Sequence, residues 1–332
     1  MQSQLDATFE QSSRKFKASD VTAANLASWQ AQLRAELSDL LGVTGRLPAG
    51  RPQRVEHIST TDRGAITEEL YIVPLDGLNV PIYVLVPKTP GPHRAVLAFH
   101  GHAPGVGYML GKYPDEATAR ERTAMHANFA ELLALDGYLV VAVEQRAFGE
   151  RVTNLVGGSL NSCRHIAFNY LAYGMTLLGE RIRDAVLAIN LIETRADVIP
   201  GWIGCVGHSG GGTTGLFLSA LEPRVTTNVV SGYFCDYRYS IFGIEHCECN
   251  YVPGLLKVCG IEEISVLTAP RRMVFVNGQT DHIYPVAHAR SAFAPVNRAY
   301  EAIGAADAVA LVVHDGGHRF WYPAAKDWLT GS

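Results

Sequence analysis

The serine in the segment Gly207-His208-Ser209-Gly210-Gly211 has the surroundings of a catalytic nucleophile. The segment follows the apolar run 202–206, which predicts a buried strand, and precedes a predicted helix over 212–221. A Gly-x-Ser-x-Gly motif at such a junction forms a turn so tight that only glycine fits beside the serine, whose hydroxyl then projects above the sheet. The motif alone is weak evidence, and the alternative is a serine that merely caps a helix.

Two further residues lie where a serine nucleophile needs them. A serine hydroxyl requires a base to take its proton, and the base requires a carboxylate that holds its tautomer. We assign His318 as the base and Asp281 as the carboxylate, since they follow the strand-like runs 308–313 and 272–276. The resulting chain order of serine, aspartate and histidine is one of the known orders for such a triad.

Other residues near these positions compete for both roles. The rival bases are His208, His282 and His314, and the rival acids are Glu144 and Asp315. The tight turn at Ser209, called a nucleophile elbow, should direct the side chain of the neighbouring His208 away from the serine hydroxyl. Glu144 precedes the nucleophile in the chain, which breaks the expected order of serine, acid and base. His314 remains open as a base, because it ends a predicted strand and a shift in loop register would bring it to the serine.

The oxyanion formed when the serine attacks a carbonyl needs preorganised N–H donors. The backbone N–H of Gly210, directly after the nucleophile, should supply one of them. The second should come from the glycine-rich loop 100–105, which follows the predicted strand 95–100, and we choose the N–H of His102. We also expect the imidazole of His102 to line the pocket, and the alternative is a plain histidine in a glycine-rich surface loop.

Composition excludes several classes of partner. The 332 residues carry a net charge of −4, so no basic field favours nucleic acid or an anionic membrane. The longest aliphatic run, 138–143, is far below the ~20 residues of a membrane span. The first residues lack the layout of a secretory signal, and the six cysteines lack the spacing of a disulfide scaffold. We therefore expect a reduced, cytoplasmic protein, and the oligomeric state, including a homo-oligomer, stays open.

The arrangement of elements predicts an α/β fold with a mostly parallel sheet and helices on both faces. Residues 52–87 read as antiparallel leading strands, and Pro81 suggests that the last of them lies at an edge. Strand-like runs then alternate with helical stretches, at 95–100, 138–143, 202–206, 226–231, 272–276 and 308–313. Catalytic groups in such sheets gather at the carboxyl ends of the strands, where the three proposed residues fall.

We divide the chain into an N-terminal helical extension, residues 1–50, and a catalytic domain, residues 51–332. Ser19 or Asp20 would cap a helix that ends at Gly42 and carries an apolar stripe of Leu26, Trp29, Leu33, Leu37 and Leu40. Within the catalytic domain, residues 232–268 are rich in aromatic side chains and form a candidate lid, although most such aromatics are simply core.

With these motifs, the chain resembles the α/β-hydrolase superfamily, in its dienelactone hydrolase and acetylxylan-esterase-like branch. The resemblance covers roughly residues 55–325 and rests on His100-Gly101-His102, the segment 207–211, Gly278-x-x-Asp281-x-x-x-Pro285 and Gly317-His318. The stretches 144–151 and 246–254 also look similar, although Glu144 and Ala147 depart from the Asp and Arg-Gly of many relatives. The resemblance implies carboxylic-ester hydrolysis with no metal or organic cofactor.

We therefore expect a serine esterase that cleaves a small-molecule ester, with acetyl esters as the first candidate. Its candidate substrate-binding residues are Arg146, Phe148, His208, Tyr233 and Trp321. The alternatives are a peptidase, lactonase or carbon–carbon hydrolase with the same triad, and a noncatalytic binding module on the same fold. A zinc site at His246, Cys247 and Cys249 is less favoured, because a second ligand pair is missing, and a metal-dependent hydrolase that uses His246 and Cys247 is a further alternative.

Overall fold

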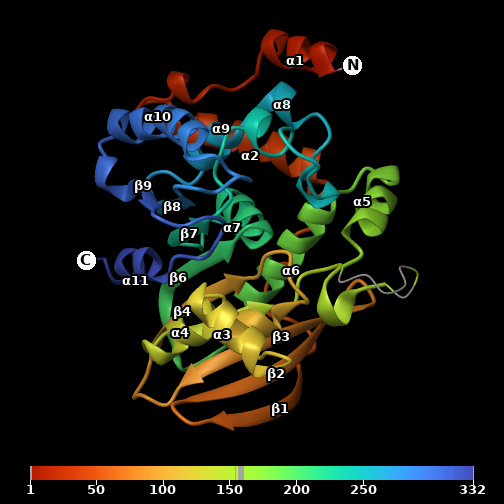
Figure 1. Cartoon of the computed structure of the whole chain (residues 1–332), viewed down its shortest axis with the longest axis vertical. Helices are drawn as coiled ribbons and strands as arrows, with labels where there is room; N and C mark the ends of the chain where they lie inside the picture. The colour runs from red at the N-terminus through yellow and green to blue at the C-terminus, as the bar shows by residue number, and fades with distance from the viewer. Residues whose placement is uncertain (1, 154, 156–160, 332) are drawn as a thin grey trace.

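The apolar runs of the sequence pair into one mixed sheet in the computed structural model, which describes residues 2–153, 155 and 161–331 (Figure 1). Across the sheet the strands of this described part stand in the order β1-β2-β3-β5-β4-β6-β7-β8-β9. Strands β1, β2, β3 and β5 pair antiparallel, and the pairs from β5 onward are parallel. The bounds are Glu56–Arg63 (β1), Ile66–Leu75 (β2), Leu78–Pro87 (β3), His93–Phe99 (β4), Leu139–Val143 (β5), Val198–His208 (β6), Thr227–Ser231 (β7), Arg272–Gly278 (β8) and Val309–His314 (β9).

Helices connect the parallel strands and precede the sheet. The α-helices are Gln2–Gln11 (α1), Leu26–Leu41 (α2), Glu116–Ala124 (α3), Phe129–Leu135 (α4), Cys163–Ala172 (α5), Leu177–Ile192 (α6), Gly210–Leu221 (α7), Leu255–Val258 (α8), Ile261–Val266 (α9), Val286–Ala302 (α10) and Tyr322–Thr330 (α11). Short 3-10 helices occupy Ala18–Asp20 (η1), Val106–Leu110 (η2), Gly149–Arg151 (η3), Tyr237–Tyr239 (η4), Glu248–Asn250 (η5) and Ala306–Ala308 (η6). This alternation confirms the predicted α/β-hydrolase fold.

The core lies on both faces of the sheet, because successive side chains of a strand point to opposite sides. In β4, Leu97 and Phe99 pack in a cluster with residues of α2, α6, α7, α9 and α10. Val96 and Ala98 of the same strand pack on the other face with residues of α4 and α11. Figure 1 shows β1, β2 and β3 at one end of the sheet and β8 and β9, beside α10, at the other.

The prediction that Pro81 marks an edge strand is wrong. β3 lies between β2 and β5, and β1 forms the edge. Pro81 pairs with Ile72 of β2, while pairing with β5 begins one residue later, where Ile82 faces Val143. The proline therefore stands at the end of the ladder with β5, and only its carbonyl is used there, accepting the N–H of Glu144 at 3.1 Å.

The first long helix, α2, begins later than predicted and ends as predicted. The expected caps Ser19 and Asp20 lie in η1 instead. A turn in which the Thr22 N–H donates to Asn25 Oδ1 at 2.8 Å precedes the helix, and Asn25 stands at its N-cap. Gly42 ends it with a φ of 72°, a left-handed conformation that glycine adopts without strain. The polar turn between Thr22 and Asn25 therefore sets the start of the helix, in place of the cap that residue type alone predicted at Ser19 or Asp20.

None of the helices in the described ranges combines the length and the apolar character that a bilayer crossing requires. All six cysteines are free thiols in the structure.

Truncating the stripe of α2 should be costly. Leu37 is fully buried and packs in the same core cluster as side chains from the strands of the sheet. Leu37→Ala should therefore lower the free energy of unfolding by about 2–5 kcal/mol, the cost of a core cavity. Leu135→Ala is the matched control, since Leu135 is 53 % exposed, and it should change stability by less than about 0.5 kcal/mol. Urea titration followed by circular dichroism measures both, and equal losses would contradict the prediction.

Candidate active site

Ser209 stands at a sharp, strained turn between β6 and α7. Its φ of 54° and ψ of −121° are unusual for a residue with a side chain. A Cβ at Gly207 would lie 2.1 Å from the carbonyl oxygen of Gly211, and a Cβ at Gly211 would lie 2.0 Å from that of Phe99. The turn is therefore closed by backbone packed directly on backbone, and its glycines are required by this close approach.

Asp281 and His318 are joined in the arrangement that holds an imidazole for proton transfer. His318 Nδ1 donates to Asp281 Oδ2 at 2.8 Å, which leaves Nε2 as the nitrogen able to accept a proton. The other carboxylate oxygen, Oδ1, accepts the N–H groups of Ile283 at 2.9 Å and Tyr284 at 3.1 Å. Burial by itself would raise the pKa of Asp281, but the hydrogen bond from His318 and these N–H groups lower it below its usual value.

Ser209 and His318 line the same cavity of about 450 Å³. The Ser209 N–H donates to the carbonyl of Ser231 at 2.8 Å, and a Cβ on the next residue, Gly232, would lie 3.2 Å from His318 Cε1. Within the described residues, no hydrogen bond joins Ser209 Oγ to the His318 ring. Such bonds are often long in unliganded enzymes and tighten when the substrate binds.

The rival bases and acids have other contacts. The His314 ring stacks on Trp321, with centroids 5.3 Å apart, and His314 Nδ1 accepts the N–H of Gly316 at 3.1 Å. Asp315 is exposed and pairs with Arg319 at 3.4 Å. His282 is exposed and does not line the cavity described above.

The rival acid Glu144 is buried below the loop that follows β4. One of its oxygens lies 3.1 Å from His100 Nε2, and the other accepts the N–H of Val106 at 3.2 Å. A Cβ at Gly105 would lie 2.6 Å from that second oxygen. Glu144 therefore positions the loop that carries His102, a role that sequence reasoning missed because only the fold brings the two segments together.

The predicted oxyanion donors lie next to the serine. Gly210 is the first residue of α7, and the first N–H groups of a helix have no partner within it and carry partial positive charge. The His102 ring packs against this position, since a Cβ at Gly210 would lie 3.0 Å from its Cε1 and Nδ1. The side chain of His102 thus lines the cavity, as expected from the sequence.

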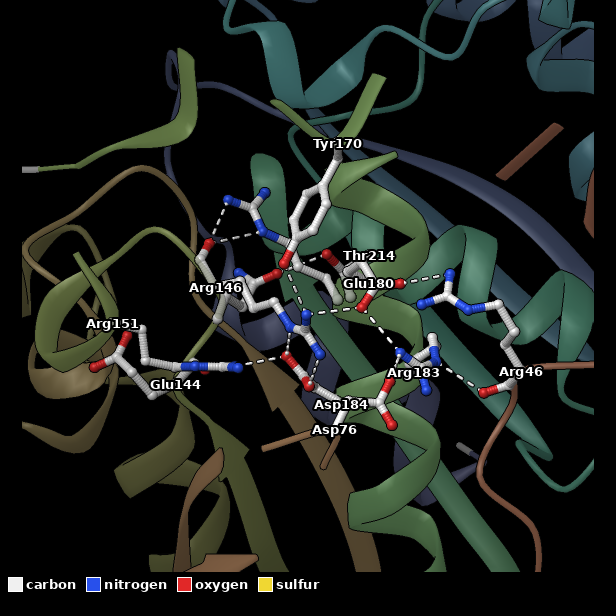
Figure 2. Close-up of polar contacts among 12 residues, drawn as sticks. Arg46, Asp76, Glu144, Arg146, Arg151, Tyr170, Glu180, Arg183, Asp184 and Thr214 are labelled. Atoms are coloured by element: carbon white, nitrogen blue, oxygen red, sulfur yellow. Dashed lines mark hydrogen bonds and ion pairs between the residues drawn. The ribbon is translucent and has the colours of Figure 1, made fainter. Parts of the chain in front are cut away.

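Of the five predicted substrate-binding residues, the structure brings only His208 to the cavity wall. Arg146 lies instead in a buried network of ion pairs (Figure 2). It binds Asp184 through Nε at 2.9 Å and Nη2 at 3.0 Å, Glu180 at 2.7 Å and the Tyr170 hydroxyl at 2.9 Å. Arg151 joins the same Asp184 at 2.6 Å. The partners of Arg146 take four of the five N–H groups of its guanidinium, which explains why it does not face substrate.

The aromatic candidates Phe148, Tyr233 and Trp321 also lie outside the cavity lining. Phe148 is buried, with its ring edge-on to those of His100 and His102. Tyr233 is buried as well, and Trp321 stacks on His314. Sequence reasoning marked these rings by their proximity to motifs, whereas burial decides which of them face the cavity.

The described cavity lining comes largely from residues that no motif marked. Its apolar part includes Tyr108, Met109, Met125, Ala127, Phe129, Ile283 and Phe320. Its polar part includes Arg122, Glu245 and Arg319. The candidate lid segment 232–268 contributes Ile244, Glu245, His246 and Cys247 to the wall, while its aromatics Tyr233, Phe234 and Tyr237 are buried in the core.

The candidate metal ligands that the structure brings together differ from the set grouped from the sequence. The side-chain donors of His102, Cys163, Cys247 and Cys249 all lie within 4.8 Å of one another. His246, which the sequence grouped with the two neighbouring cysteines, is not one of them. Its ring nitrogens face the Tyr284 hydroxyl at 3.0 Å and Asn250 Nδ2 at 3.1 Å.

The backbone contact behind Gly211 predicts a large effect of a single methyl group. In Gly211→Ala the new Cβ meets the carbonyl of Phe99, which cannot move without distorting β4, so the free energy of unfolding should fall by about 3 kcal/mol or more. Gly107→Ala is the control, because its Cβ would meet nothing closer than 3.6 Å. Thermal and urea unfolding compare the two, and a Gly211→Ala protein as stable as this control would refute the packing argument.

The stability of the fold should also depend on protonation of His208. Burial, with the neighbouring His318, lowers the pKa of His208 from 6.5 to about 3, and its Nδ1 has no hydrogen-bond partner among the described residues. Between these two pH values the unfolded chain binds a proton that the folded chain does not, so His208 makes stability fall as pH falls through this window.

In His208→Phe, the drop in melting temperature between pH 7 and pH 4 should be smaller than in the wild type. Replacement of the exposed His57 by Phe is the control and should leave the drop unchanged. Scanning calorimetry across this pH range measures the drop in melting temperature. An undiminished drop in His208→Phe would contradict the lowering of the His208 pKa by burial.

Comparisons with known proteins agree with this fold. The chain is 31% identical over 294 residues to the "Putative hydrolase YtaP" of Bacillus subtilis, covering 87% of this chain and 94% of that protein. It is 27% identical over 221 residues to a 2,6-dihydropseudooxynicotine hydrolase of Paenarthrobacter nicotinovorans, covering 66% and 50% of the two chains. No family model matches the sequence.

Among solved structures, one described as a "putative acetyl xylan esterase" from Bacteroides fragilis superposes with a TM-score of 0.77 at 19% identity, covering 93% of this chain and 81% of that one. This likeness concerns the fold. The identity to YtaP extends over most of both sequences, and the chain therefore belongs to the same hydrolase family as YtaP, on the α/β-hydrolase fold described above.

Proposed function

We propose that the protein is a serine esterase in which Ser209, His318 and Asp281 form the catalytic triad. The observation that carries this proposal is the strained Ser209, which opens on a cavity shared with an imidazole whose Nδ1 is held by a buried carboxylate at 2.8 Å. A structural serine has no need of a positive φ, and such strain is characteristic of residues under functional constraint.

The first half of the proposed reaction forms an acyl-enzyme. Ser209 Oγ attacks the ester carbonyl while its proton passes to His318 Nε2, and Asp281 stabilises the imidazolium that results. The carbonyl oxygen becomes an oxyanion, which the N–H groups of Gly210 and His102 would stabilise. The C–O bond of the ester then breaks, and the alcohol leaves with the proton from Nε2.

Water completes the cycle in the second half. It attacks the acyl carbon and gives its proton to His318 Nε2. The acyl carbonyl oxygen becomes a second oxyanion, which the N–H groups of Gly210 and His102 would again stabilise. The bond to Ser209 Oγ breaks, the serine recovers its proton from the imidazolium, and the carboxylic acid departs.

The cavity favours a small substrate. Its volume of about 450 Å³ lies at the lower end of the range for small-molecule sites, and its lining combines aromatic and aliphatic side chains with a few charged ones. The fold-level likeness to a protein described as an acetyl xylan esterase adds support for a short acyl group such as acetyl. Amides, lactones and carbon–carbon bonds remain the alternatives, since the same triad serves these reactions.

Ser209→Ala should abolish turnover of p-nitrophenyl acetate, with a loss in kcat of at least about 10⁴-fold, because the nucleophile is removed. A fluorophosphonate probe should label the wild type on Ser209 and leave the variant unlabelled, as read by peptide mass spectrometry. Ser291→Ala on α10 is the matched control and should keep both properties.

A panel of acyl chain lengths, acetylated sugars, lactones and amides then defines the substrate class. Folded wild-type protein that takes no probe and turns over no member of the panel would favour the noncatalytic binding module. Labelling without ester turnover would favour one of the alternative reactions.

A further inference from the structure

A cluster of four metal-ligating side chains lies beside the proposed oxyanion loop. The sulfur atoms of Cys163, Cys247 and Cys249 and one ring nitrogen of His102 are all within 4.8 Å of one another. They come from three separate parts of the chain, namely the loop after β4, the first residue of α5 and the segment around η5. We propose that these four side chains bind a structural zinc ion.

The spacing of the donors matches a tetrahedral zinc site. Zn–S bonds of about 2.3 Å and a Zn–N bond of about 2.0 Å place the ligand atoms roughly 3.5–3.8 Å apart. His102 Nε2 lies 3.5 Å from Cys249 Sγ, and none of the four donors is more than 4.8 Å from another. The limit of 4.8 Å exceeds this spacing by about 1.0–1.3 Å, so a contraction of at most this size would complete the site. Three thiolates and one imidazole form a Cys₃His set, which is among the common sets of structural zinc sites.

An independent observation about charge supports the presence of a metal–thiolate group. The guanidinium of Arg181 is 2 % exposed and makes no ion pair with a carboxylate among the described residues. Its Nη2 lies 3.2 Å from Cys163 Sγ, its remaining bonds go to the carbonyl of Arg146, and its face lies 4.9 Å from the Phe148 ring centre. A buried cation without a counter-ion is costly, so an anion is expected at the sulfur atoms.

Neighbouring arginines make the contrast clear. Arg146 and Arg151, in the same region, both pair with Asp184, and Arg146 also pairs with Glu180 (Figure 2). Of these three arginines, Arg181 alone is directed to a cysteine, at Cys163 Sγ. A zinc ion with three thiolates and a neutral imidazole has a net charge of −1, which this guanidinium would neutralise while donating an N–H···S bond of the kind that supports metal ligands.

The surroundings of the cluster fit a closed, structural site. Cys163 and Cys249 are buried, Cys247 is half-buried, and His102 is exposed. Asn250 is fully buried and directs its Nδ2 to Cys249 Sγ at 3.5 Å and to the Cys247 carbonyl at 3.4 Å. Four protein ligands leave no open position for substrate, so the zinc would hold the fold rather than act on the ester.

The position of the site assigns it a role in the architecture of the cavity. Zinc would tie the loop that carries His102 to α5 and to the segment that supplies Cys247 to the cavity wall. Zinc binding requires only the four side chains of the cluster, whereas the role of this loop in stabilising an oxyanion rests on the proposed function. Labelling of Ser209 by a fluorophosphonate tests that function separately, so the two failures are distinguishable.

The test starts with the wild-type chain, produced without an affinity tag in zinc-supplemented medium and purified without chelators. Inductively coupled plasma mass spectrometry should find about one zinc per chain. X-ray absorption at the zinc edge should give a first shell of three sulfur atoms near ~2.3 Å and one nitrogen near ~2.0 Å. Removal of the zinc should lower the melting temperature by several degrees, because binding stabilises only the folded state.

Variants localise the site. Cys249→Ala should lose the zinc, while Cys259→Ala, which removes a buried free thiol outside the cluster, should retain it. Arg181→Met should weaken zinc binding by about 10–100-fold, as loss of a supporting hydrogen bond to a ligand does, with circular dichroism as the check on folding. The proposal would be overturned by a wild-type protein that takes up no zinc under reducing conditions, by a disulfide within the cluster, or by a zinc shell without three sulfur atoms.

Discussion

The positive φ of Ser209 is the constraint on which the site depends. A conformation of this kind costs on the order of 1–3 kcal/mol and persists only where the surroundings over-determine it. Here the surroundings are backbone atoms, since Gly207 touches Gly211 and Gly211 touches the carbonyl of Phe99. β4, β6 and α7 are thereby pressed together at one point, and this contact lifts the serine hydroxyl toward the cavity while the N-terminus of α7 lies behind it.

The parallel register of the sheet places the partners of the serine at the same edge. His208 pairs with Ser231 in β7, and Gly278 of β8 pairs with His314 of β9. The loops that follow these strands therefore emerge side by side, and Asp281 reaches His318 across them. Residues 37 positions apart in the chain meet because strand ends are aligned by hydrogen bonding between neighbouring strands, a relation that holds for any open parallel sheet.

Buried charge organises the region next to this edge. Arg146 and Arg151 are neutralised by carboxylates of α6, whereas Arg181 of the same helix turns to the cysteines. Glu144 supports the loop after β4 from below through the N–H of Val106. The loop that carries His102 is thus bounded by charged groups on one side and by the strained turn on the other, which gives it a defined position without regular secondary structure.

What the sequence determined by itself were the properties that depend on neighbouring residues. The elbow glycines, the apolar strands and the Ser, Asp, His order are local patterns, and the structure brings Asp281 and His318 together as those patterns predicted. The fate of Arg146, the lining of the cavity and the Cys₃His cluster were decided only by the tertiary structure. Burial, charge pairing and side-chain proximity depend on which distant segments pack together, and no local pattern encodes them.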